Sequence, residues 1–173
     1  ISAHYDTVMC AGFCDNGAGL AGVIELARVF AEASEEGVNN MPKYTLVFIA
    51  FAAEEFGLVG SINYVKGHKA EMKNIGGVIK LDCIGNDILE VAETSASGGL
   101  DMDELVLKAA SDLDVEAMLT EAGGSDQEAF RYPTEANNVL ERFWGTNAGI
   151  SNVTPVEAST AFYSYPLYYF DFL

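Results

Sequence analysis

The sequence predicts an α/β fold in which helices sandwich a mixed, largely parallel central sheet. Short runs rich in β-branched and aromatic residues alternate along the chain with stretches of helical periodicity, which is the pattern of such a sheet. The 173 residues suffice for one domain, and 50% of them are hydrophobic, so a packed core is available. No internal repeat or low-complexity segment interrupts the pattern. We therefore expect a single domain over residues 1–173.

The first half of the sheet follows from three segments. Residues 1–4 predict the end of a strand, and residues 44–53 form an apolar run typical of a central strand buried on both faces. Between them, periodicity predicts a helix from about residue 17 to residue 34. Its apolar face carries Leu20, Val23, Ile24, Ala27 and Ala31. Its charged face carries Glu25, Arg28 and Glu32.

The second half of the chain continues the alternation. Apolar residues recur at helical spacing after Asp101, which is well placed as an N-cap. The expected elements are a helix over 58–67, strands over 77–81 and 88–92, a helix over 102–113, and two weaker strands over 115–119 and 152–156.

Both ends of the sequence suggest a fragment. The chain starts with Ile1 rather than an initiator methionine and finishes in an apolar run over residues 168–173. We expect a domain truncated at both ends, so the sequence leaves the cellular compartment open.

Charge and cysteine usage narrow the function classes. The chain has 26 acidic and 9 basic residues, a net charge of −17, which opposes binding to nucleic acid and to anionic membranes. The longest apolar run, residues 46–53, is far shorter than the roughly 20 residues of a membrane span. Three cysteines exclude a disulfide framework, although a Cys10–Cys14 bridge fits an exported protein. With only two histidines, any metal site must consist mainly of carboxylates.

Polar residues of one chemical kind follow three of the predicted strands. His4 and Asp6 end the first strand, Glu54 and Glu55 end the long apolar one, and Asp82 follows the next. Ligands of α/β sheets gather beyond the carboxyl ends of the strands. We therefore expect metal ligands or acid/base groups at this edge of the sheet.

The chemistry of these residues suits a cation. His4 and Asp6 share one face of an extended segment, so Asp6 can accept the second imidazole N–H and orient a metal-binding histidine. Glu54 and Glu55 repel each other at the exit of a buried strand, which a nearby cation relieves. Asp15, at the start of the first helix, also fits a helix cap, and each of the others alone also fits a cap or a solvated strand end.

Taken in order, the motifs are similar to those of the M28 family of zinc aminopeptidases, whose relatives include glutaminyl cyclases. The motifs are His-x-Asp from residue 4, Asp-Asn-Gly-Ala-Gly from residue 15, Glu-Glu-Phe-Gly-Leu-Val-Gly-Ser from residue 54 and Leu-Asp-Cys-Ile-Gly from residue 81. The resemblance continues more loosely through residues 124–130 and 148–150 to the end. It implies the same α/β fold as the periodicity does.

The resemblance also implies a site with one or two zinc ions. His4 and Asp82 resemble ligands of one ion, Asp15 resembles a carboxylate that bridges two, and Glu55 resembles a ligand of the second. The family has a cis peptide after the bridging aspartate, which here is Asp15-Asn16.

Catalysis is implied for two further residues. Glu54 resembles the general base that takes the proton of the attacking water, and Asp6 resembles the carboxylate that supports His4. The implied activity is a metallo-exopeptidase that acts on peptides with a free N-terminus, and secretion or a periplasmic location is slightly favoured by analogy. Candidates for an apolar substrate pocket are the aromatic residues Phe143, Trp144, Tyr163 and Tyr165.

The sequence departs from the family at the last ligand. The family has a histidine near the C-terminus, where this chain has Tyr169 or Phe170, and Gln127 stands where a histidine often follows Asp126. His68 is expected to be a solvated residue. This departure favours one alternative, a non-catalytic M28-like binding module. A second alternative, a single-zinc acyltransferase of the glutaminyl cyclase type, also needs that histidine and gains nothing from the departure.

Overall fold

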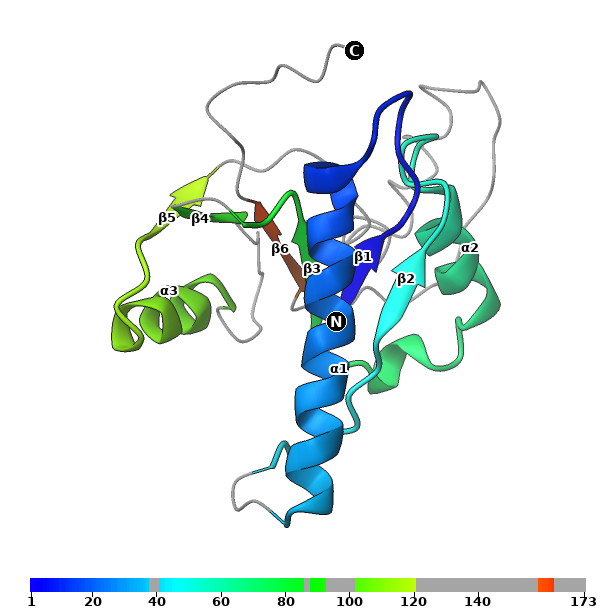
Figure 1. Ribbon diagram of the computed structural model, residues 1–173. Coiled ribbons are helices and arrows are strands. Elements are labelled where there is room, and N and C mark those ends of the chain that lie inside the picture. The colour runs from blue at the N-terminus through cyan, green and yellow to red at the C-terminus, as the bar shows by residue number, and fades with distance from the viewer. Residues whose placement is uncertain (38–40, 86–87, 93–101, 121–158, 164–173) are drawn as a thin grey trace.

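Strands and helices alternate in the computed structural model, which describes residues 1–37, 41–85, 88–92, 102–120 and 159–163 (Figure 1). The elements, in chain order, are β1 (Ser2–His4), η1 (Phe13–Ala18), α1 (Gly19–Glu35), β2 (Ile49–Phe51), α2 (Val59–Gly67), η2 (Met72–Asn74), β3 (Val78–Asp82), β4 (Leu89–Ala92), α3 (Met102–Asp112), β5 (Ala117–Thr120) and β6 (Ser159–Tyr163).

The strands form one sheet in the order β2-β1-β3-β6-β4-β5. All neighbouring strands are parallel except the antiparallel pair of β4 and β6. The predicted mixed, largely parallel sheet between helices is thus confirmed. Because β1, β2 and β3 run in the same direction, their carboxyl ends, at His4, Phe51 and Asp82, lie at one edge of the sheet.

Helix α1 packs across one face of this sheet, over β1 and β3 (Figure 1). On this helix, Val23 is buried, and Gly22 lies against the side chains of Leu81 and Ile84. The predicted apolar face was too wide, because the sheet covers only a narrow stripe of the helix: Ile24 is 61% exposed.

The charged face of α1 is solvent-exposed, as predicted. Arg28 forms ion pairs with Glu25 at 2.6 Å and with Glu32 at 2.7 Å. Spacings of three and four residues bring these side chains together on a helix, so the pairs support α1 locally.

The opposite face of the sheet carries the main described core. Val78, Lys80 and Asp82 alternate along β3 with Leu81, which faces α1, so these three residues point away from α1. Here α2 and η2 pack on β2 and β3. The core consists of Phe51, Leu58, Ile62, Val65, Met72 and Val78.

Strand β2 differs from its prediction in length and position. It covers three residues instead of residues 44–53, and it lies at the edge of the described sheet rather than in the centre. Tyr44 is 84% exposed. A hydrophobic run indicates that a segment tends to be buried. The order of strands depends instead on pairing between distant segments, and the run carries no information about that pairing.

The later elements were predicted in part. β3, β4, α2 and α3 lie within one residue of their predicted bounds, and β5 starts two residues later and ends one residue later than the predicted strand over 115–119. β6 was not predicted, while Asp101 and residues 152–156 lie outside the described residues. Among the described helices, none has the length and apolar character that a membrane span requires.

Candidate metal centre

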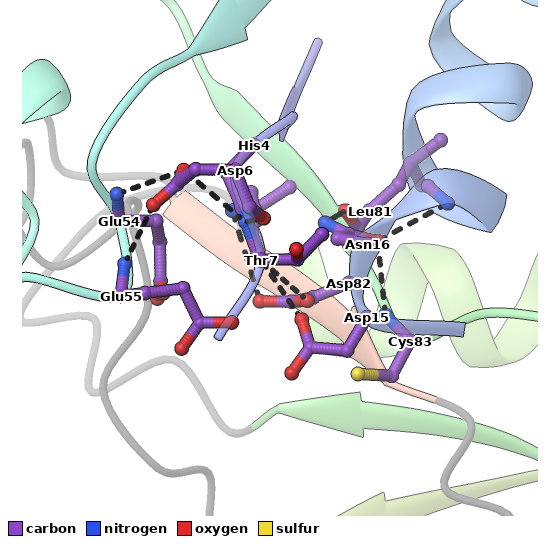
Figure 2. Close-up of polar contacts among 12 residues, drawn as sticks. His4, Asp6, Thr7, Asp15, Asn16, Glu54, Glu55, Leu81, Asp82 and Cys83 are labelled. Atoms are coloured by element: carbon purple, nitrogen blue, oxygen red, sulfur yellow. Dashed lines mark hydrogen bonds and ion pairs between the residues drawn. The ribbon is translucent and has the colours of Figure 1, made fainter. Parts of the chain in front are cut away.

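Four segments bring ionisable side chains together at the carboxyl edge of the sheet (Figure 2). The end of β1 supplies His4, η1 supplies Asp15, and the end of β3 supplies Asp82. The turn after β2 supplies Glu54 and Glu55. The residues that the sequence predicted for this edge thus meet in space.

His4 lies at the middle of the cluster and is 1% exposed. Its Nε2 atom is 3.0 Å from Oδ1 of Asp15 and 3.3 Å from Oδ1 of Asp82. Its Nδ1 atom lies 3.0 Å from the main-chain carbonyl of Asp6, to which an Nδ1–H group donates. This bond orients the ring and leaves Nε2 to face the two carboxylates.

The charge state of His4 follows from these neighbours. Burial disfavours the imidazolium, but the hydrogen bonds to Asp15 and Asp82 outweigh burial and raise the pKa of His4 to about 10. Without a metal ion, His4 is therefore protonated at neutral pH and serves as the cation between the two carboxylates.

Asp6 supports the cluster in a different way from the one predicted. Its carboxylate Oδ1 is 3.6 Å from Nδ1 of His4, so the main-chain carbonyl, not the carboxylate, accepts the imidazole hydrogen bond. The carboxylate instead accepts the backbone N–H groups of Glu54 at 3.1 Å and Glu55 at 3.2 Å. Asp6 thereby ties the turn after β2 to the end of β1.

Asp15 reaches the cluster because η1 is not a regular helix. Asp15 and Asn16 have non-helical backbone angles, and the peptide bond between them is cis, as the resemblance predicted. The Asp15 side chain is 30% exposed, so this part of the cluster opens to solvent.

Asn16 holds η1 against β3, a role that the sequence analysis did not assign. Its Nδ2 donates to the carbonyl of Leu81 at 2.9 Å, and its Oδ1 accepts the N–H groups of Gly19 at 3.1 Å and Cys83 at 3.2 Å. A side chain at Gly19 would place Cβ only 2.2 Å from Asn16 Oδ1, so this contact requires glycine. The sequence did contain a signal for this role, because Asn16 belongs to the Asp-Asn-Gly motif. That motif was interpreted only for Asp15.

Asn16→Ala is expected to lower the free energy of unfolding by about 2–4 kcal/mol, because two buried hydrogen bonds and one partly buried one are lost, and two backbone N–H groups lose their acceptor. Urea unfolding measures this change. Asn63→Ala is the matched control, since Asn63 makes its hydrogen bond on the exposed side of α2. An equal, small effect of both substitutions would contradict the anchoring role of Asn16.

The cluster has the donor chemistry of a metal site. Two groups within it have ligand atoms that all lie within 4.8 Å of one another: His4 with Glu54 and Asp82, and His4 with Asp15 and Glu55. Imidazole nitrogen and carboxylate oxygen are ordinary zinc ligands. Burial, and then the negative charge of Asp15, raise the pKa of Glu55, so keeping this carboxylate ionised costs free energy. A divalent cation in the cluster would lower that cost.

A third group adds a residue that was not predicted. The Cys83 thiol lies within 4.8 Å of ligand atoms of Asp15 and Asp82. Burial and these carboxylates raise the pKa of Cys83 well above its usual range, so its thiol stays protonated at neutral pH. All three cysteines are free thiols in the structure.

Two other candidates from the sequence lie within the described residues, and His68 is not part of the cluster. His68 ends α2, where its ring stacks on Tyr64 and its Nδ1 lies 2.8 Å from the Tyr64 carbonyl. The backbone of Tyr163 pairs with Asp82 at the end of β6. The remaining candidates, Asp126, Gln127, Phe143, Trp144, Tyr165, Tyr169 and Phe170, lie outside the described residues.

Comparisons with known sequences point to one family. The profile of Peptidase family M28 matches residues 1–139. A probable zinc metalloprotease of Pyrenophora tritici-repentis is 40% identical over 83 residues, which are 48% of this chain and 18% of the relative. Aminopeptidase YwaD of Bacillus subtilis is 35% identical over 95 residues, 54% of this chain and 19% of the relative.

Solved structures agree with these matches. BSAP, a zinc aminopeptidase from Bacillus subtilis, has a TM-score of 0.58 and 26% identity, and the match covers 94% of this chain and 35% of that one. LapA of Legionella shares the fold, with a TM-score of 0.61 and 21% identity over 96% of this chain and 41% of that one. The matched segment spans less than a fifth of these curated relatives and less than half of either solved chain.

Proposed function

Because this chain belongs to peptidase family M28, we propose that it acts as a zinc-dependent aminopeptidase, which removes residues from peptides with a free N-terminus. The observation that carries the proposal is the convergence of one buried imidazole and four carboxylates at the carboxyl edge of the sheet. Relatives that are zinc metalloproteases and an aminopeptidase support it.

The proposed zinc ligands are four residues of the cluster, assigned by the family resemblance rather than by the two distance groups. His4 and Asp82 would hold one ion, Glu55 would hold a second, and Asp15 would contribute to both. His4 and Asp15 already direct Nε2 and Oδ1 toward each other at 3.0 Å, with Asp82 Oδ1 at 3.3 Å from the same nitrogen. We expect the first ion to bind well and the second weakly, since the sequence has Tyr169 or Phe170 where the family has its last histidine.

Glu54 is the proposed general base. Zinc, when bound, polarises the scissile carbonyl and lowers the pKa of water. Glu54 accepts a proton from the attacking water as the water oxygen bonds to the carbonyl carbon, then passes this proton to the amine nitrogen as the C–N bond breaks. The Asp6 carboxylate keeps Glu54 in place by accepting a hydrogen bond from the backbone N–H of Glu54.

Hydrolysis of leucine p-nitroanilide tests this proposal. The zinc-loaded protein is expected to release nitroaniline. Hydrolysis should stop after treatment with a chelator and resume after zinc is added back. N-acetylleucine p-nitroanilide is the matched control and should remain intact, because its amine is blocked. Zinc-loaded protein that hydrolyses neither anilide nor unblocked peptides would favour a non-catalytic binding module, and cyclisation of an N-terminal glutamine would favour the acyltransferase.

Zinc binding is also expected to release protons. At pH 7.5 the metal-free protein keeps His4 protonated, since its pKa is about 10, and Nε2 must lose that proton to bind zinc. Calorimetric titration in buffers of different ionisation enthalpy should therefore report release of about one proton per zinc, with an affinity that rises as pH rises toward 10. Zinc binding without proton release would contradict the assignment of His4.

A further inference from the structure

A buried lysine lies directly beneath the metal centre. Lys80 is on β3, two residues before Asp82, so both side chains point to the same face of the sheet. The Lys80 side chain is 0% exposed, and it is the largest of the fully buried side chains in the described part of the chain. Lysine is almost never buried to this degree unless it is paired.

The two carboxylate oxygens of Asp82 have different neighbours, and Lys80 lies on the side of Oδ2. Nζ of Lys80 lies 3.7 Å from Oδ2, whereas Oδ1 lies 3.3 Å from Nε2 of His4. One oxygen therefore faces a fixed ammonium within the core, and the other faces the ligands at the centre. At 3.7 Å the Lys80 contact is an ion pair rather than a hydrogen bond, so Lys80 acts on this oxygen through its charge.

We propose that Lys80 is a positioning residue of the metal centre, which makes Asp82 a ligand through Oδ1 alone and lowers the affinity of the centre for divalent cations. This inference rests on the zinc site of the proposed function. In the metal-free protein, Lys80 offsets part of the negative charge of the clustered carboxylates. When a divalent cation binds nearby, the same ammonium repels it across a low-dielectric interior, and it keeps Oδ2 from joining the coordination.

Zinc affinity, measured by competition with a chromophoric chelator, tests the proposal. Lys80→Met keeps the length and apolar stem of the side chain and removes its charge, and we expect this variant to bind zinc about tenfold or more tightly. Lys73→Met is the matched control, because it removes the same charge from an exposed position on η2, and it should leave the affinity almost unchanged.

Two further readouts separate positioning from a purely structural role. The absorption spectrum of the Co²⁺ form should change in Lys80→Met, because release of Oδ2 adds an oxygen to the coordination. Zinc should also raise the melting temperature of this variant more than that of the unchanged protein, since tighter binding adds more stability. Lys80→Gln, which also lacks the charge, gives the same comparisons if Lys80→Met does not fold.

The outcomes distinguish this inference from the proposed function. If the unchanged protein binds zinc and hydrolyses anilides, yet Lys80→Met and Lys80→Gln have its zinc affinity and Co²⁺ spectrum, the inference alone is wrong. A melting temperature lowered equally with and without zinc would likewise assign Lys80 a structural role only. If the unchanged protein does not bind zinc, both the inference and the proposed function fail.

Discussion

Glu54→Gln is expected to lower kcat by about 100- to 10,000-fold and to leave the first zinc ion in place, because glutamine cannot accept the proton of the attacking water. The backbone N–H that Asp6 accepts is unchanged by this substitution, so the turn after β2 keeps its position. Hydrolysis of leucine p-nitroanilide measures the rate, and elemental analysis of the dialysed variant measures the zinc content.

Glu71→Gln is the matched control for this prediction. Glu71 is exposed at the start of η2, and the change alters the net charge by the same amount outside the cluster. Its rate should equal that of the unchanged protein. An active Glu54→Gln variant with full zinc content would show that another residue is the base.

His4→Ala is expected to have the largest effect on metal binding. Removing even an outer-shell partner of a metal ligand weakens binding about 10- to 100-fold, so loss of the buried imidazole itself should weaken zinc binding by at least about 100-fold. The anilide hydrolysis at micromolar zinc should disappear with it. Chelator competition provides the zinc affinity.

The control for His4→Ala is His68→Ala. His68 packs on Tyr64 at the end of α2 and belongs to none of the candidate metal groups among the described residues. Its replacement should leave zinc affinity and hydrolysis unchanged. If the two variants lose zinc equally, the loss reflects general destabilisation and the role assigned to His4 is wrong.

Local patterns in the sequence were enough to predict much of the fold. The helix-spaced apolar residues around Val23 and the charged positions around Arg28 predicted α1, because a helix places such residues on opposite faces. The β-branched run before Asp82 predicted β3. The parallel class followed from the alternation of these elements, and it placed the ends of β1, β2 and β3 at one edge.

Features that depend on pairing between distant segments were not predictable in this way. β6 lies between β3 and β4 although nearly 70 residues separate Ala92 from Ser159, and no local pattern encodes that insertion. The edge position of β2 depends on the same long-range pairing. Local hydrophobicity constrains burial, and it leaves the strand order open.

In the candidate site, too, local sequence identified some residues, while the roles of others depend on contacts with distant segments. His4 and Asp82 could be named from the sequence because each stands at the end of a strand, and Asp15 because its motif resembles that of the M28 family. Asn16 and Lys80 could not, since their roles depend on contacts across η1 and β3. A buried lysine in a strand carries no local signal of the carboxylate it faces.

We propose that one zinc centre forms at the carboxyl ends of β1 and β3, with η1 completing it. Anomalous diffraction recorded at the zinc absorption edge, on crystals of the zinc-loaded protein, tests that claim most directly. We expect a strong anomalous peak within bonding distance of His4 Nε2, Asp15 and Asp82 Oδ1, with Glu54 outside the bonding distance. A peak elsewhere, or none in protein that retains zinc, would contradict it.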